Sequence, residues 1–154
     1  MVYSSPANLE ATGGYSGGVA IVVPTHWMPG LLTSETVVPG YVLQITKQYQ
    51  QQSQTWTVAY LRPGHTLEIL RQWDQYWTRH PPRDRVYIGG DLNRIDTDYP
   101  QEWFQFLMKW KLADVTGNTR TFALKDGGLT SLDKWVIRDD TYSKGHLTVK
   151  VKAT

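Results

Sequence analysis

The feature of this chain that most constrains its fold is the alternation of short β-branched runs with two amphipathic helical segments. Strands and helices bury side chains with periods of 2 and 3.6 residues, so a change of period marks a change of element. Apolar spacings of three and four predict a helix at 66–78, ended by the prolines at 81 and 82, and a second helix starting near Pro100 with Asp98 as N-cap. Strands are predicted at 17–23 (buried), 41–47, 55–61, 85–90, 119–124, 132–137 and 147–151. This order predicts a sheet-on-sheet core with helices packed outside.

Composition limits the classes of protein and of site. The chain has 154 residues, which fits one domain, and no Cys, which excludes disulfides, thiolate metal sites and a Cys nucleophile. No apolar run approaches the ~20 residues of a membrane span, and the first ten residues lack a signal-peptide pattern. We therefore expect a soluble, intracellular protein, nuclear or cytoplasmic, without a membrane partner. Its net charge of +2 is dispersed, which permits a polyanionic partner without requiring one.

Three segments are predicted to lack regular structure. Residues 1–16 are rich in Ser, Gly and Asn and are expected to be a loose N-terminal segment. Residues 25–39 contain two Pro and a Gly and are predicted to be a loop. The Gln-rich residues 50–54 are predicted to be a polar hairpin loop between two strands.

Polar side chains at strand ends are the candidates for chemistry. The sequence Gly-Gly-Asp-Leu-Asn at 89–93 follows a buried strand and presents Asp91 and Asn93 at its end. A carboxylate there can orient or deprotonate a water, and an amide can position that water or a phosphate oxygen. The alternative is ordinary turn chemistry after a strand. Tyr60, on the same strand face as Trp56 and Val58, is predicted to pack with its hydroxyl at the rim.

Asp133 and His146 are a second candidate pair. Strand alternation puts Asp133 on one face with Trp135 and Ile137, where a carboxylate requires a partner, and His146 at the start of the last strand is the simplest one. A carboxylate-oriented imidazole can donate to a phosphoryl oxygen or move a proton. Two alternatives stay open. Asp133 points outward while Leu132 and Val136 point inward, or His146 is a surface residue.

The ordered motifs GGVAIVV, VAYLRPG, YIGGDLNRI, WKLADV, NTRTF, TSLDKWVI and GHLTV resemble the endonuclease/exonuclease/phosphatase superfamily. They are especially similar to the endonuclease domains of LINE-type (non-LTR) retrotransposons, over residues 17–151. The resemblance implies an α/β fold with a two-sheet β-sandwich flanked by helices, in four layers. It places a partial domain of this kind at residues 17–154.

The resemblance also implies a function and its residues. The family hydrolyses phosphodiesters with Mg²⁺ or Mn²⁺, and its DNA endonucleases imply DNA as the partner. Tyr60 corresponds to the phosphate-contacting tyrosine, Asp91 to the aspartate that activates or orients the attacking water, and Asn93 to its neighbour. Asp133 corresponds to the aspartate that orients the catalytic histidine. His146 corresponds to that histidine.

One further residue is predicted from position alone. Arg94, adjacent to the Asp-x-Asn motif, is expected to contact phosphate. The sequence does not identify the metal ligands.

Two departures from the family pattern predict impaired activity. The family begins with strands ending in an Asn and in Gln-Glu-Thr, whose Glu holds the metal, several tens of residues before the GGVAI strand. Only sixteen residues precede Gly17, and Glu10 is too close to that strand. The family's Ser-Asp-His is Lys-Gly-His here, so Gly145 replaces an Asp. We therefore expect a domain that lacks the first strands and exposes a sheet edge. Either residues 1–16 cover this edge, or a partner chain covers it, or the chain is a decayed gene fragment that folds poorly.

Two other readings remain beside an impaired nuclease. One is a non-catalytic structural or interaction module derived from the same fold. The other is a Trp-rich carbohydrate-binding sandwich, which requires exposed Trp. It is disfavoured because four of the seven Trp, Trp73, Trp77, Trp103 and Trp110, lie on the apolar faces of predicted helices.

Overall fold

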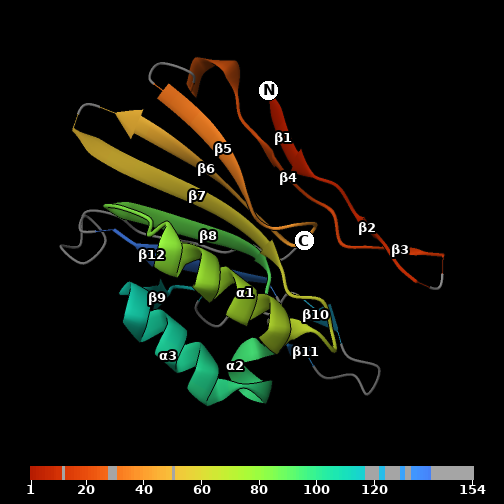
Figure 1. Ribbon diagram of the computed structural model, residues 1–154. Coiled ribbons are helices and arrows are strands. Elements are labelled where there is room, and N and C mark those ends of the chain that lie inside the picture. The colour runs from red at the N-terminus through yellow and green to blue at the C-terminus, as the bar shows by residue number, and fades with distance from the viewer. Residues whose placement is uncertain are drawn as a thin grey trace.

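The computed structural model describes residues 1–11, 13–27, 31–49, 51–116, 122–123, 129–130 and 133–139. Its centre is a six-stranded sheet in the order β5-β6-β7-β8-β12-β9 (Figure 1). These strands are β5 (Leu31–Val38), β6 (Val42–Tyr49), β7 (Gln52–Tyr60), β8 (Arg85–Asp91), β9 (Ala113–Asp114) and β12 (Asp133–Arg138). The large sheet with few helices confirms the α/β class.

The directions of the strands bring the ends of three chain segments together at one end of this sheet. Strands β7 and β8 are parallel and are joined through helix α1 (Thr66–Arg79), whereas β12 is antiparallel to β8. The last residues of β7 and β8 and the first residue of β12 therefore lie at the same end. This edge carries the strand-end residues singled out from the sequence.

The helices cover one face of the sheet. Helix α1 and helix α3 (Pro100–Trp110) lie together on this face, and the short α2 (Ile95–Asp98) leads from the end of β8 into α3 (Figure 1). The buried core contains Trp73, Trp77, Trp103, Phe106 and Trp110 against Val86, Ile88 and Val136. Both long helices were predicted, but Asp98 is not the N-cap. It ends α2, and Tyr99 caps α3 without a side-chain hydrogen bond.

The N-terminal residues are not loose, contrary to expectation. Strand β1 (Val2–Ser5) pairs with β4 (Val19–Val22), and β2 (Asn8–Leu9) pairs with β3 (Tyr15–Ser16). The predicted strand at 17–23 is thus shorter, and it is not buried, since Val22 is 73% exposed. The β1–β4 pair packs on the sheet face opposite the helices, where Leu43 and Ile45 are buried. Composition could not reveal this pairing, which joins residues about twenty positions apart.

The segment predicted as a loop at 25–39 contains strand β5, so that prediction was wrong. Strand β5 is an edge strand whose residues 33–36 are exposed, so its apolar side chains do not alternate. A register shift between Thr36 and Val38 and the charge of Glu35 are typical of protected edges. The prolines that suggested a loop flank the strand.

The two-sheet, four-layer sandwich stays a prediction. Within the described residues, the β1–β4 pair packs on the face opposite the helices as a separate two-stranded sheet. The pair β10 (Phe122–Ala123) and β11 (Leu129–Thr130) is short. The predicted strand at 147–151 and most of that at 119–124 lie outside the described residues. Residues 52–54 of the predicted Gln-rich loop belong to strand β7, which begins at Gln52.

Candidate functional site

Three of the predicted site residues are neighbours across three strands. In the backbone register, Asp91 of β8 pairs with Tyr60 of β7 on one side and with Asp133 of β12 on the other. Register partners in adjacent strands project to the same face of a sheet, with β-carbons only about 5 Å apart. Here that face is the one opposite the helices. Tyr60, Asp91 and Asp133 therefore stand side by side at the ends of three adjacent strands.

The glycines before Asp91 allow this close packing. Gly90 has a φ of +143°, and a β-carbon there would lie 2.0 Å from the carbonyl oxygen of Ala59. A side chain at this position would push β8 away from β7. Gly90 therefore lets the strand end stay within hydrogen-bonding distance of its neighbour, and the Leu61 amide donates to the Asp91 carbonyl oxygen at 2.9 Å.

Asn93 anchors the turn that follows β8. Its backbone amide donates to the Asp91 carboxylate at 2.9 Å, and its side-chain amide donates to the carbonyl oxygen of Leu61. Its φ of +49° is a left-handed conformation that Asn tolerates better than most residues. The turn chemistry that the sequence offered as one alternative is therefore present, and a catalytic role of Asp91 and Asn93 stays a prediction.

Asp91 lies in an environment that disfavours its charge. Partial burial raises the pKa of its carboxyl above the ordinary value, the hydrogen bond from the Asn93 amide opposes this, and the charge of Asp133 raises the pKa further. A carboxylate with a raised pKa is a stronger base than an ordinary one. Such perturbed carboxylates are more frequent at functional sites than elsewhere.

We expect Asp91→Asn to stabilise the protein at neutral pH. The pKa of Asp91 is raised on folding, so the folded state retains the proton more strongly than the unfolded state. The contribution of Asp91 to folding stability is complete at pH values below its pKa in the unfolded state. That contribution is lost as the pH rises through its pKa in the folded state. The variant, which carries no charge, should therefore gain stability over the wild type as pH increases. Urea unfolding at several pH values measures this, and a stability difference independent of pH would contradict it.

Asp133 points outward, which is one of the two orientations that the alternation of side chains along this strand left open. It is exposed and shares a face with Trp135, whereas Lys134 and Val136 are buried on the helix side. Its pairing with His146 stays a prediction, because residue 146 lies outside the described residues, as does Gly145. Asp133 makes further contacts within the chain.

The fold of the chain is similar to several solved structures. The endonuclease domain of TRAS1, a telomere-specific non-LTR retrotransposon, superposes with a TM-score of 0.64 at 14% identity, over 92% of this chain and 69% of that domain. An endonuclease/exonuclease/phosphatase family protein from Leptotrichia buccalis gives 0.57 at 14%, over 99% and 61%. D. rerio TDP2 humanized by 14 mutations gives 0.51 at 13%, over 90% and 60%. No family model and no curated protein sequence matches the chain.

The chain has the endonuclease/exonuclease/phosphatase fold. It spans 60% to 69% of the length of these three neighbours. The superfamily resemblance read from the motif order is therefore confirmed at the level of the fold. At these identities the assignment of individual site residues stays a prediction.

Sequence reasoning missed two residues beside the strand ends of this fold. Arg62, two residues after Tyr60, forms an ion pair with Glu10, and each side chain is 33% exposed. A hydrogen bond with Tyr41, together with the Glu10 charge, raises the pKa of Arg62. The Arg in Tyr-Leu-Arg-Pro was a visible signal, but the pairing of β2 with β3 that places Glu10 beside it was not visible in the sequence. Arg94, in contrast, is half-exposed and lies 3.7 Å from Asp98 within its own turn.

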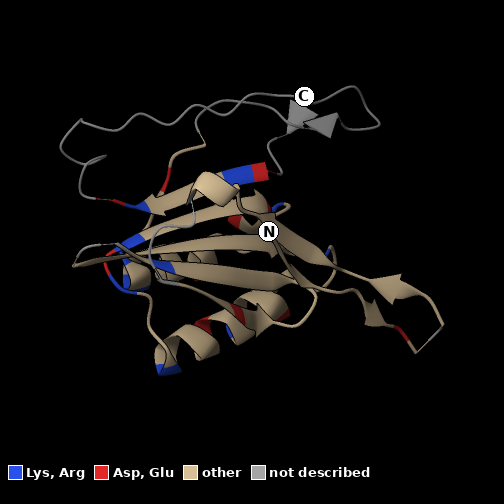
Figure 2. Ribbon diagram, turned by 90° about the horizontal axis from the view of Figure 1, so that it is seen from above, with Lys and Arg blue, Asp and Glu red and all other residues tan. Residues whose placement is uncertain are grey.

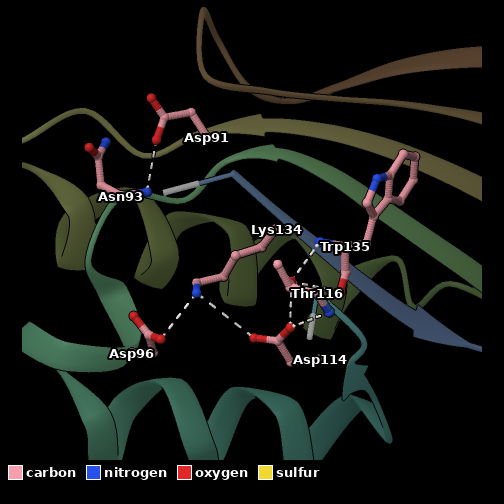
Figure 3. A network of polar contacts seen from close by, with 7 residues as sticks. All are labelled: Asp91, Asn93, Asp96, Asp114, Thr116, Lys134 and Trp135. Carbon is pink, nitrogen blue, oxygen red and sulfur yellow. Dashed lines mark hydrogen bonds and ion pairs between the residues drawn. The ribbon is translucent and has the colours of Figure 1, made fainter. Parts of the chain in front are cut away.

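A second polar cluster lies beneath the site, on the helix side of the sheet. Figure 3 shows Lys134 between Asp96 of α2 and Asp114 of β9, while Asp91 and Trp135 point away from the helices. Asp114 also accepts hydrogen bonds from the backbone amide and the hydroxyl of Thr116, at 3.0 and 2.6 Å. The cluster therefore ties α2, β9 and β12 together directly behind the candidate site.

Next to the site, the face opposite the helices carries an apolar cavity of about 470 Å³. Trp56 and Tyr87 stack with ring centroids 4.1 Å apart, and Trp135, which is 37% exposed, lies over Gly89. Residues 20–22 of β4 form its other wall. The cavity thus continues from Asp133 along the aromatic face of the sheet.

Metal ligands are the part of the site that the described residues define least. They contain no group of three or more His, Asp or Glu side chains placed to hold a metal ion. Two carboxylates, Asp91 and Asp133, do lie opposite each other in register.

Among the helices of the described residues, none is long and apolar enough to cross a membrane.

Proposed function

We propose that this chain is a divalent-metal-dependent phosphodiester hydrolase of the DNA endonuclease type. The observation that carries the proposal is the register of Tyr60, Asp91 and Asp133 at one edge of the sheet, with Asn93 anchoring the turn beside them. A hydroxyl donor and a carboxylate base at one place are what attack of water on a phosphodiester requires. The likeness in fold to an endonuclease domain supports the same reaction class.

In this proposal each residue has a distinct task. Asp91 orients the attacking water and accepts its proton, which suits a carboxyl with a raised pKa. Tyr60 donates from its hydroxyl to a phosphoryl oxygen. Asn93 holds the Asp91 turn against the end of β7. Asp133 orients His146, which transfers a proton or donates to the phosphate, and Arg94 contacts a neighbouring phosphate.

We further propose that Mg²⁺ or Mn²⁺ binds beside Asp91 and Asp133. The two carboxylates fit a hard cation, since such ions prefer oxygen ligands and keep several waters, and since Asp91 and Asp133 are register partners. When bound, the ion polarises the phosphoryl oxygen and eases departure of the leaving group. With Gly145 at a position where the family pattern has Asp, we expect weak activity.

DNA is the proposed substrate by resemblance rather than by charge. Figure 2 shows basic and acidic residues distributed over strands, helices and loops of the described chain, without one basic stripe. The net charge of +2 agrees with this dispersion. DNA binding should therefore depend on the candidate site itself. The location of the protein in the nucleus or the cytoplasm stays a prediction.

Nicking of supercoiled DNA tests the function. The wild type should nick in Mg²⁺ or Mn²⁺ and stop nicking when EDTA removes the metal, and His146→Ala should lose most of this activity. Equal, background-level activity of the wild type and of variants at Asp91 and His146 would contradict the hydrolase. That result would favour a non-catalytic interaction module instead.

The second function is a non-catalytic interaction module, and the apolar cavity favours it. Among the described strands, β4 pairs only with β1, and residues 20–22 of β4 border the cavity over Trp56, Tyr87 and Trp135. An extended strand from a partner chain could pair with this edge and cover the aromatic side chains. Such a partner would protect both an edge and an apolar face.

We expect a soluble peptide of alternating Val and Thr to bind this face, measured by calorimetry. Trp135→Glu should abolish binding, because a carboxylate would face the aromatic cavity. Phe104→Glu is the matched control, since Phe104 is 62% exposed on the outer side of α3. Binding that is equally lost in both variants, or absent in the wild type, would exclude strand addition at this site.

A further inference from the structure

Lys134 carries a buried charge on the helix side of the sheet. Its side chain is 4% exposed, although it follows the exposed Asp133 directly in β12. Strand alternation points it toward the helices, and its ammonium lies 3.0 Å from the Asp96 carboxylate and 4.0 Å from that of Asp114 (Figure 3). A buried ammonium is tolerated only when it is paired, as it is here.

The partners of Lys134 connect it to the site through the backbone. Asp96 is the third residue after Asn93, in α2, whose first residue Ile95 is fully buried. The turn between them is continuous with Asp91, because the Asn93 amide donates to the Asp91 carboxylate. The Lys134 to Asp96 bridge therefore joins the turn after β8 to the start of β12.

The second partner holds the other side of the ammonium. Asp114 accepts from Thr116, and the backbone amide of Trp135 donates to the Thr116 hydroxyl at 3.0 Å. This contact fixes β9 against β12 one residue from Lys134. The ammonium is thus the point at which α2, β9 and β12 meet, on the opposite face of the sheet from Asp91 and Asp133.

We propose that Lys134 is a positioning residue for the proposed hydrolysis: through Asp96 it sets the place of Asp91 and Asn93 relative to Asp133. The inference rests on the proposed function. Lys134 acts through the backbone and does not touch the substrate, because the sheet separates its ammonium from the site. Displacement of a catalytic group by about 1 Å can reduce a rate by ~10²-fold.

The test is Lys134→Met, which keeps the length of the side chain and removes its charge. We expect kcat for nicking to fall by about 10-fold or more while KM for DNA changes less than about twofold. Lys109→Met is the matched control, because Lys109 pairs with Asp74 at 3.1 Å between α3 and α1, and it should leave both constants unchanged. A rise in KM alone, or an unchanged kcat in a folded variant, would overturn the proposal.

Asp96→Asn is the second variant and covers the case in which Lys134→Met does not fold. It weakens the same bridge at a residue that is 44% exposed, so kcat should fall at constant KM. In the double variant the two losses should not add, since both break one interaction. Full additivity, or normal kcat in Asp96→Asn, would show that Lys134 does not act through Asp96.

Hydrogen exchange separates this inference from the proposed function. The Asn93 amide, which donates to Asp91, and the amides of α2 should exchange faster in both bridge variants than in the wild type and in Lys109→Met. Unchanged protection would overturn the positioning role regardless of activity. A wild type that fails to nick DNA would instead contradict the hydrolase itself.

Discussion

Replacing Asp91 with Asn is expected to lower metal-dependent nicking of DNA by about 10²–10⁴-fold, the range for removal of a general base. Asn keeps the shape of the side chain and can still accept the hydrogen bond from the Asn93 amide, so the turn should remain in place. What is lost is the ability to take a proton from water and to attract a cation. The loss should therefore appear in kcat, measured under saturating DNA.

Asp74→Asn is the control for this substitution. Asp74, in α1, accepts hydrogen bonds from Lys109 and from the Trp110 indole of α3, away from the strand ends. Asp74→Asn makes the same change of carboxylate to amide as Asp91→Asn. Because Asp74 lies away from the strand ends, nicking should be unaffected. If Asp91→Asn nicks as fast as Asp74→Asn while the wild type is active, then Asp91 is not the base, and the assignment of the site is wrong.

Trp77→Ala is expected to remove about 3–5 kcal/mol of stability, the usual cost of truncating a buried aromatic residue. Trp77 is fully buried, and its ring contacts Trp73, Phe106 and Trp110. Its indole also donates to Gln44 at 2.9 Å, so the truncation leaves a buried amide oxygen without this donor. Because small domains are stable by only about 5–15 kcal/mol, the variant should be marginally folded.

Urea unfolding followed by circular dichroism measures this loss. Trp77→Phe should lose less, since it keeps an aromatic ring and removes mainly the hydrogen bond to Gln44. Trp135→Ala is the exposed control and should cost about 1 kcal/mol, the centre of the range for single substitutions. Equal losses at the two tryptophans would mean that the α1–α3 interface is not the main core.

The helices and most strands of the large sheet were predictable because their signals are local. The spacing of Leu70, Trp73 and Trp77 identifies α1 without knowledge of what it packs against. The Asp-x-Asn turn was visible in the same way, since Gly90 and Asn93 are residue types that unusual backbone angles require. Strand β5 escaped prediction because an edge strand with exposed side chains has no apolar alternation to detect.

The sequence by itself determined which segments bury a face and which residues end a strand, because hydrophobic period and backbone preference depend on near neighbours. Only the tertiary structure decided that Tyr60, Asp91 and Asp133 stand side by side, since this depends on the parallel crossover through α1 and on insertion of β12 beside β8. It also decided that Lys134 points away from Asp133 into a buried ion pair. Both depend on contacts between residues far apart in the chain, which no local pattern records.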